Sequence, residues 1–363
     1  MKLIEKSTIL ISESVTGNAN TDLQKRQVDS MTIKDIAARV QVSVTTVSRV
    51  LNDKPDVHPQ TRKKILEVIE ESGYRPSGLA RGLAMQKTNI IAFLVPDITN
   101  PNFPELARGV VDRAKEFGYS VMFFDTNHDV HMEKEAIHVL ESKQVDGIIL
   151  SFSGESMDEL QKLKREHFPA VQIYRKSPNS VISTIAIDNV ESAYKATKYL
   201  VDLGHRNIAH LARSLKTMSG QERVIGYKRA LADLHIPLRA EWLLEGEYTR
   251  DSGYANMNRL LDMEIRPTAV FAANDVIAIG AYQAIYDRGL TIPDDISIVG
   301  HDDIEFAEIL RPRLTTVTTF KYKLGQAAVD LVLEEISGST ERQKEIIFHT
   351  ELVVRDSASE LQH

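Results

Sequence analysis

The chain has 363 residues, enough for two or three domains, and its 42% hydrophobic and 26% charged residues are typical of a globular protein. It contains no cysteine, which excludes disulfides and thiolate metal sites and fits a reducing, cytoplasmic compartment. No apolar run reaches about eighteen residues and no secretory signal is evident, so we expect no membrane span. The net charge of −7 argues against attraction of the whole surface to nucleic acid.

Residues 1–30 contain Ser, Thr and Asn with balanced charge, and they show no clear periodicity. We expect them to be a disordered extension, or sequence upstream of a true start at Met31. A functional N-terminal arm is the alternative interpretation.

The stretch from Met31 to Asn52 predicts two short helices separated by a tight break. Thr32 and Asp35 have the spacing of a capping box for the first helix, and Ser43 is a suitable N-cap for the second. Apolar residues recur at helical spacing and predict an inner face made of Ile33, Ile36, Ala37, Val40, Val47, Val50 and Leu51.

The outer face of the second helix carries small polar groups and one long cation, as in a helix-turn-helix whose second helix enters the DNA major groove. Arg49 can donate two hydrogen bonds to a guanine edge, Thr45 can bond a base or a phosphate, and Val44 can touch a thymine methyl. An ordinary helical pair at a domain edge is the alternative. The predicted DNA-binding residues of the head are Thr32, Ser43, Val44, Thr45, Thr46, Ser48, Arg49 and Asn52.

A third helix is predicted to begin at Pro59 and to end at Gly73, which completes a DNA-binding domain over residues 31–75. Residues 31–87 contain ten basic and six acidic residues, a net charge of +4. Residues 88–363 contain thirty basic and forty-one acidic residues, a net charge of −11. A basic head on an acidic body would turn the head toward DNA phosphates.

From Thr88 onward, apolar strands alternate with helical stretches, and this rhythm repeats after Ile187. Such a βαβα pattern predicts two lobes, each a doubly wound parallel sheet covered by helices on both faces. Ligands of such sheets bind at the carboxyl ends of the strands. Strands are expected at 90–95, 119–124, 146–150, 170–174, 185–187, 207–211, 242–244, 269–271 and 297–299.

Polar and aromatic side chains follow several of these strands, and they suit a sugar or another small polar ligand. Asn274 can instead cap its helix, Tyr174 can be wall packing, and Asp303 and His301 are expected to be mainly structural. The predicted effector-binding residues are Asp97, Asn102, Phe103, Asp125, Tyr174, Arg223, Tyr248, Asn274 and Asp302.

An ordered run of motifs resembles the lactose-repressor/galactose-repressor (LacI/GalR) family of bacterial transcription regulators. The resemblance covers about residues 31–355 and rests on IKDIAARVQVSVTTVSRVLN, TRKKILEVIEESGYRP, LARGLA, VPDITNPNF, QVDGIIL, GHRNIAHL, PTAVFAANDVIAIGA and ISIVGHDDIEFAEILRPRLTTV. It implies a small helix-turn-helix headpiece and a body with the fold of periplasmic binding proteins. The chain would cross between lobes near Asp188, near Thr318 and near the C-terminus.

The resemblance further implies a hinge over residues 76–87 that becomes helical on the operator. Leu83 matches the leucine that the family wedges into the minor groove, although it can also be a packing residue of the linker. Positions matching Phe103, Arg223, Tyr248, Asn274 and Asp302 line the effector cleft of the family. The body would span 88–363, with lobe 1 at about 88–187 and 319–348 and lobe 2 at about 188–318 and 349–363.

The resemblance predicts a homodimeric repressor of carbohydrate-metabolism genes, with operator DNA and a sugar-like effector as its partners. Residues 355–363 contain no leucine heptads, which favours a dimer over a coiled-coil tetramer. The ARGLA stretch with a following lysine also resembles members that respond to a phosphorylated carrier-protein corepressor.

Motifs of the main enzyme classes are missing, because the chain has no dinucleotide fingerprint, P-loop, nucleophile elbow or HExxH. We therefore expect no enzyme activity, no cofactor and no metal site, and we expect His128 and His131 to be exposed. A sugar-binding receptor without DNA activity would fit the body alone. The helix-turn-helix and the missing secretory signal argue against that alternative.

Overall fold

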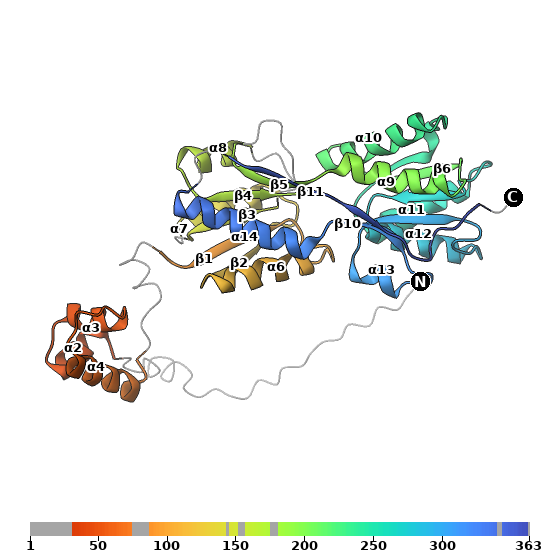
Figure 1. The fold of residues 1–363 in the computed structure, drawn as a ribbon. Coiled ribbons are helices and arrows are strands. Elements are labelled where there is room, and N and C mark those ends of the chain that lie inside the picture. Colours follow the sequence, from red (N-terminus) through yellow and green to blue (C-terminus); the bar gives the residue numbers. More distant parts are fainter. Residues whose placement is uncertain are drawn as a thin grey trace, which may run out of the picture. The chain divides into compact units, whose positions relative to one another are not determined.

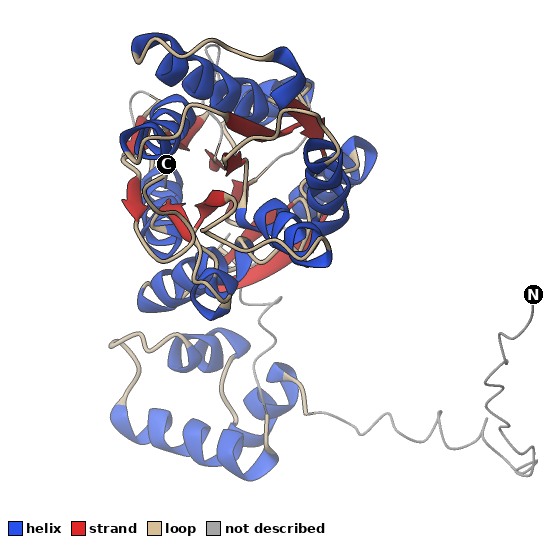
Figure 2. Ribbon diagram, turned by 90° about the vertical axis from the view of Figure 1, so that its right-hand side faces the viewer, coloured by secondary structure: helices blue, strands red, loops and turns tan. Residues whose placement is uncertain are grey.

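A computed structural model describes residues 31–74, 87–142, 145–151, 157–174, 181–339 and 343–361. The chain divides into two compact units, a head that extends to Gln86 and a body that begins at Lys87. The described part of the head contains only helices, whereas the body combines strands and helices (Figures 1 and 2).

The head consists of three helices around a small core: α2 (Ile33–Val40), α3 (Val44–Leu51) and α4 (Pro59–Ser72). The side chains of Ile36, Val47 and Ile65 are completely buried, one from each helix. Ile36 and Val47 are positions that the helical periodicity places on the inner face, so the predicted helix-turn-helix is confirmed.

The ends of the head helices follow from local hydrogen bonding. The backbone N–H of Asp35 donates to Thr32 Oγ1 at 3.3 Å, and the N–H of Thr32 donates to Asp35 Oδ2 at 2.8 Å. This is the predicted capping box. Ser43 Oγ accepts the N–H of Thr46 at 3.1 Å and caps α3. Gly73 ends α4 with a left-handed φ of 63°, which glycine adopts without strain.

The first lobe of the body is a six-stranded parallel sheet with the strand order β11-β5-β4-β3-β1-β2. Helices α6 and α14 pack on one face around Phe93, and α7 and α8 pack on the other face around Leu94. Both faces of β1 are therefore buried, which explains its uninterrupted apolar sequence. The bounds are β1 Ile90–Val95, α6 Phe103–Glu116, β2 Ser120–Asp125, α7 Val130–Ser142, β3 Gly147–Leu150, α8 Met157–Arg165, β4 Ala170–Ile173, β5 Ser183–Ile187, α14 Lys321–Ser337 and β11 Glu345–Phe348.

The second lobe has the strand order β12-β10-β9-β8-β6-β7, in which only β12 is antiparallel to its neighbour. Helices α11 and α12 cover one face around Val270, and α9 and α10 cover the other around Phe271. The bounds are α9 Asn189–Asp202, β6 Ile208–Arg213, α10 Met218–Asp233, the 3-10 helix Ala240–Trp242, β7 Leu243–Gly246, α11 Arg250–Leu261, β8 Ala269–Ala272, α12 Asp275–Asp287, β9 Ser297–Asp302, α13 Glu305–Ile309, β10 Thr315–Thr318 and β12 Glu351–Val353.

The chain passes between the two sheets three times, after β5, after β10 and after β11. The second passage leads into α14, which packs closely on α6. A Cβ on Gly109 of α6 would lie 2.1 Å from the backbone oxygen of Tyr322, so only glycine permits this approach. The fold class predicted from the sequence, a helical headpiece and two doubly wound lobes, is confirmed.

Candidate functional site

Helix α3 presents its polar face to solvent, on the side opposite Val47 and Val50. The side chains of Val44, Thr45 and Arg49 are exposed. Arg49 forms an ion pair with Asp56 in the turn before α4, and the hydrogen bond from Arg49 holds the pKa of Asp56 below its usual value. These three side chains therefore have the exposure that contact with base edges requires.

The other predicted DNA-binding side chains of the head also have local roles. The hydroxyls of Ser43 and Thr46 lie 2.9 Å apart at the start of α3, and Asn52 Nδ2 donates to Ser48 Oγ at 3.4 Å at its end. Thr32 belongs to the capping box of α2. They shape the helix pair, and their contact with DNA stays a prediction. Leu83 lies outside the described residues.

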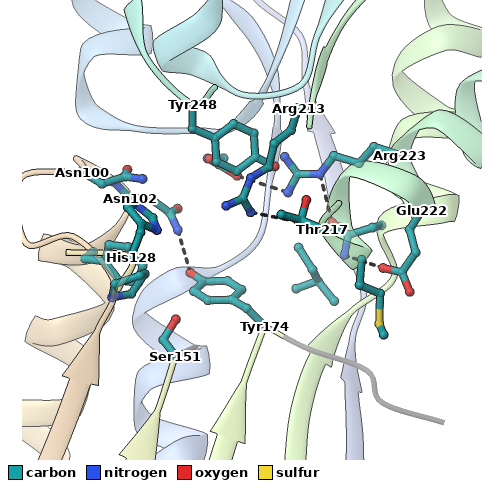
Figure 3. Close-up of a pocket in the computed structure, with 17 residues that line it drawn as sticks. Asn100, Asn102, His128, Ser151, Tyr174, Arg213, Thr217, Glu222, Arg223 and Tyr248 are labelled. Carbon is teal, nitrogen blue, oxygen red and sulfur yellow. Dashed lines mark hydrogen bonds and ion pairs between the residues drawn. The ribbon is translucent and has the colours of Figure 1, made fainter. Parts of the chain in front are cut away.

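The body contains a cavity between the carboxyl ends of the strands of its two lobes, with about 840 Å³ of space that includes part of the open solvent. Side chains of both lobes line it (Figure 3). The first lobe supplies Pro96, Asn100, Asn102, Phe103, His128, Ser151, Tyr174 and Ile187. The second lobe supplies Asn189, Arg213, Thr217, Met218, Ser219, Glu222, Arg223, Tyr248 and Asp302.

The first-lobe wall combines aromatic faces with neutral polar groups. Asn102 Nδ2 donates to the Tyr174 hydroxyl at 3.2 Å, and the rings of Phe103 and Tyr174 meet edge to face at 6.3 Å. Burial raises the pKa of Tyr174 far above its usual value, so the hydroxyl stays protonated. Such a wall offers directional hydrogen bonds and flat apolar contact, as polar small-molecule sites commonly do.

The second-lobe wall is built around the buried guanidinium of Arg223. Its Nε donates to Asn189 Oδ1 at 3.0 Å, and its Nη1 donates to the backbone oxygen of Ala273. Its Nη2 lies 3.7 Å from Asp302 Oδ1. The two opposite charges are both buried and compensate each other, and the hydrogen bonds of Arg223 hold its guanidinium in place.

Behind Asp302 lies the completely buried His301. Burial, together with the nearby Arg223 charge, lowers the pKa of His301 to about 4, so the ring is neutral at pH 7. Burial alone would raise the pKa of Asp302, but His301, Arg223 and Lys321 hold it below its usual value. Because Asp302 is ionised, the single ring proton of His301 belongs on Nδ1, 2.8 Å from Asp302 Oδ1. The mainly structural role expected for His301 agrees with this position.

The loop after β9 has an unusual backbone that a lysine of α14 supports. Asp302 and Asp303 both have positive φ, 104° and 53°. Lys321 Nζ donates to their backbone oxygens at 2.6 and 2.9 Å and lies 3.0 Å from Glu105 Oε2. Asp303 pairs with Arg355 at 2.7 Å. A strained turn next to the cavity is thus held from several sides.

Six of the predicted effector residues line the cavity, and three do not. Asp97 accepts hydrogen bonds from the N–H and hydroxyl of Thr99 and so closes its own turn. Asp125 ends the edge strand β2, is exposed, and accepts the N–H of Asn127 at 3.2 Å. Asn274 caps α12 by accepting the N–H of Ile277 at 2.9 Å. Capping of this helix is the alternative role that the sequence left open for Asn274. The structure places these three outside the cavity lining and in local backbone roles.

Sequence reasoning missed several lining residues. Ser151, Ile187 and Arg213 stand at the carboxyl ends of β3, β5 and β6, so the rule that ligands bind at strand ends could have found them. The predicted exposure of His128 is found, but this histidine also lines the cavity. Other missed lining residues follow the strands in loops or at helix starts, where spacing alone does not show their direction: Pro96, Asn100, Asn189, Thr217, Met218, Ser219 and Glu222.

Among the described residues, no group of three metal-binding side chains lies together. In the same part of the chain, no helix is long and apolar enough to cross a membrane.

Family profiles match both units of the chain. The profile described as "Bacterial regulatory proteins, lacI family" matches residues 32–77, and that of a "Periplasmic binding protein-like domain" matches residues 197–358.

Curated relatives share most of the chain. Catabolite control protein A of Priestia megaterium is 38% identical over 86% of this chain and 94% of its own length. The HTH-type transcriptional repressor PurR of Mannheimia succiniciproducens is 35% identical over 91% of this chain and 99% of its own length. The second name describes a transcriptional repressor, and neither name describes an enzyme.

Solved structures are similar over the same range. A lac repressor dimer bound to operator and the anti-inducer ONPF has a TM-score of 0.83 at 30% identity, covering 91% of this chain and 99% of that one. A complex of the transcriptional regulator CelR with cellobiose has a TM-score of 0.70 at 29% identity. The match covers 90% of this chain and 99% of that one.

Proposed function

Because this chain belongs to the LacI family of DNA-binding transcriptional regulators, we propose that it represses genes of carbohydrate metabolism under the control of a small polar effector, a sugar or a sugar derivative. The observation that carries this proposal is the exposed face of α3. Val44, Thr45 and Arg49 point away from a packed core within the stretch that matches the family's DNA-binding domain. Such a face can read base edges in the major groove.

The chain is proposed to bind a near-palindromic operator as a homodimer, with one α3 helix in each half-site. The similar lac repressor structure is a dimer on its operator, which supports this arrangement. A hinge that includes Leu83 remains a prediction, because Leu83 lies outside the described residues. Control by a phosphorylated carrier-protein corepressor also remains a prediction.

The cavity of the body supports control by an effector. Residues of both lobes line it, so a bound molecule would contact both and favour one arrangement of the lobes. A difference in operator affinity between the two arrangements couples the cavity to DNA. The polar lining and the cellobiose bound to the similar CelR support a sugar. The aromatic rings of Phe103 and Tyr248, and the likeness to PurR, support a purine as the second candidate.

The test is selection of operators from a random DNA pool with the full chain, followed by anisotropy titration of the enriched duplex. We expect a near-palindrome whose affinity changes in the presence of one sugar or sugar derivative. A response to purine bases alone would favour the second candidate. If no sequence is enriched above the pool, the chain is not a sequence-specific DNA-binding protein.

A further inference from the structure

The two walls of the cavity differ in their charged groups. The first-lobe wall offers neutral groups, among them Asn102, Ser151 and Tyr174 (Figure 3). The second-lobe wall carries the guanidinium groups of Arg213 and Arg223 and the carboxylates of Glu222 and Asp302. Asp302 pairs with Arg223, and Glu222 accepts a hydrogen bond from Asn189 Nδ2 at 2.9 Å. A ligand that touches both walls therefore meets hydroxyl and amide groups on one side and charged groups on the other.

The two arginines are not equivalent. Arg223 is only 5% exposed, and its charge is compensated by Asp302. Its N–H groups donate hydrogen bonds to Asn189 and to the backbone oxygen of Ala273. Arg213 forms no ion pair among the residues that the structure describes. Its polar contact in that part of the chain is with Ser219 Oγ, at 3.4 Å from Nη1, and its Nε is buried without a hydrogen-bond partner. A buried donor of a charged group is costly unless a partner arrives.

The position of Arg213 is fixed although it has no ion-pair partner among the described residues. It is the last residue of β6, and its guanidinium lies 4.4 Å from the ring centroid of Tyr248. The ring contacts the face of the guanidinium through a cation–π contact and does not use its N–H edge. A planar, positioned guanidinium is the group that proteins use for two-pronged binding of phosphate or carboxylate.

Further donors lie beside Arg213. The Tyr248 hydroxyl is also buried without a partner among the described residues. Thr217 caps the sixteen-residue helix α10 by accepting the N–H of Gly220, and Thr217, Met218 and Ser219 line the cavity next to it. The first turn of a helix adds unsatisfied N–H groups and a partial positive charge to the same side of the cavity.

We propose that the effector carries a negatively charged group, a phosphate monoester or a carboxylate, which Arg213 binds, while its hydroxyl groups face Asn102, Ser151 and Tyr174. This inference rests on the proposed effector role of the cavity and names the chemical class of the effector. A sugar phosphate and a sugar acid share this chemistry.

The test compares matched ligands on the full chain by isothermal titration calorimetry: glucose, glucose 6-phosphate and gluconate, then ribose and ribose 5-phosphate, then fructose and its phosphates. The tightest ligand is expected to be a phosphate ester or an acid. Arg213→Gln should weaken it by about 10- to 100-fold, the range for one hydrogen-bonded charge, and should leave the neutral parent unchanged. A neutral sugar that binds as tightly as its anionic derivatives would overturn the proposal. An equal loss of affinity for the neutral sugar and for its anionic derivative in Arg213→Gln would also overturn it.

Inorganic phosphate provides a test that needs no correct sugar. Thermal unfolding is followed in phosphate and in sodium chloride of equal ionic strength, because the basic head can also bind phosphate. Phosphate should raise the melting temperature of the body in wild type and in the control Arg266→Gln, an exposed arginine of the same lobe. The rise should be absent in Arg213→Gln and partly kept in Arg213→Lys. The same rise in Arg213→Gln and wild type, or no rise in wild type, overturns the proposal.

Operator binding separates this inference from the proposed function. Ligand-free Arg213→Gln should bind the selected operator as wild type does, because the change lies in the body. If wild type enriches no operator but phosphate still stabilises it through Arg213, the regulator proposal fails and the anion site stands. If an operator is found and Arg213 proves indifferent to every anion, only the anion site fails.

Discussion

The exposed face of α3 and the cavity of the body are built in different ways. On α3, the polar side chains come from one continuous helix and Arg49 is more than half exposed. In the cavity, Asn189, Arg223 and Asp302 come from three separate elements and are at most 8% exposed. The first surface gains its binding energy only when a partner excludes water, whereas the second holds its charges in place beforehand.

This difference determines where substitutions act. A group on α3 can be removed with little effect on folding, because water replaces its partners and exposed ion pairs contribute little. The paired charges of Arg223 and Asp302 in the cavity cannot be removed singly, because the buried partner stays behind without compensation. Binding and stability are thus separable on α3 and coupled at this pair.

The largest effect is expected from Asp302→Ala, which leaves Arg223 without its counter-charge. The free energy of unfolding of the body should fall by about 3–5 kcal/mol, measured by urea denaturation with the fluorescence of Trp242, the single tryptophan. The exposed Asp294→Ala is the matched control and should change little. A loss below about 1 kcal/mol in Asp302→Ala would mean that water solvates Arg223 well and that the coupling is weak.

The head also has a buried position, Ile36. A substitution there should affect both stability and DNA binding, unlike a substitution on the exposed face of α3. Ile36→Ala should cost about 2–5 kcal/mol of head stability and abolish operator binding, while the transition of Trp242 in the body stays unchanged. Circular dichroism and anisotropy on the selected operator measure the two effects. Leu66→Ala, at a site 47% exposed, is the control. Full operator affinity in Ile36→Ala would disprove the packing role.

Arg49→Ala tests the exposed face itself. It should weaken operator binding by about 1–3 kcal/mol and relax the preference at one base pair, with no loss of head stability. Lys64→Ala, also exposed, is the control and should weaken all sequences alike, if at all. If Arg49→Ala instead reduces binding to operator and random DNA equally, its contact is with a phosphate and it does not read a base.

The smallest effect concerns pH and applies to the body alone. His301 has a pKa of about 4 when folded and an ordinary value near 6.5 when unfolded, so its contribution to stability is present above pH 6.5 and is lost as the pH falls toward 4. Wild type should therefore lose about 2 kcal/mol more than His301→Gln between pH 7 and pH 5. Denaturation at both pH values measures this. His131→Gln, exposed, should behave as wild type, and parallel losses in His301→Gln and wild type would contradict the buried neutral ring.

The same contrast explains what could be predicted from the sequence. The head is a local structure, so periodicity and capping residues were sufficient to locate α2, α3 and α4. The predicted strands of the body all appear, with ends that differ by up to three residues. Strands β10, β11 and β12 were not predicted individually, because they are short and their pairing joins distant segments.

Apart from positions that the family resemblance supplied, such as Arg223 within α10, the cavity was predictable mainly where a strand end points into it. Tyr174 and Asp302 satisfy that rule, and so does Asp125, yet Asp125 ends the edge strand β2 and remains outside. Asp97 satisfies it too, but its side chain bonds to Thr99 in its own turn. Spacing gives the end of a strand, whereas the place of that strand in the sheet and the local hydrogen bonds decide which side chains a ligand can reach.

The three passages between the lobes have a consequence for synthesis of the chain on the ribosome. Strand β5 pairs with β11, Ser183–Ile187 with Glu345–Phe348, and α6 packs on α14. The first lobe therefore lacks an edge strand and a covering helix until almost the whole chain has emerged. The head can fold early because all its contacts are local, whereas the body completes its first lobe last. Until then α6 and β5 stay partly uncovered, which makes the nascent body dependent on protection from aggregation and the nascent head independent of it.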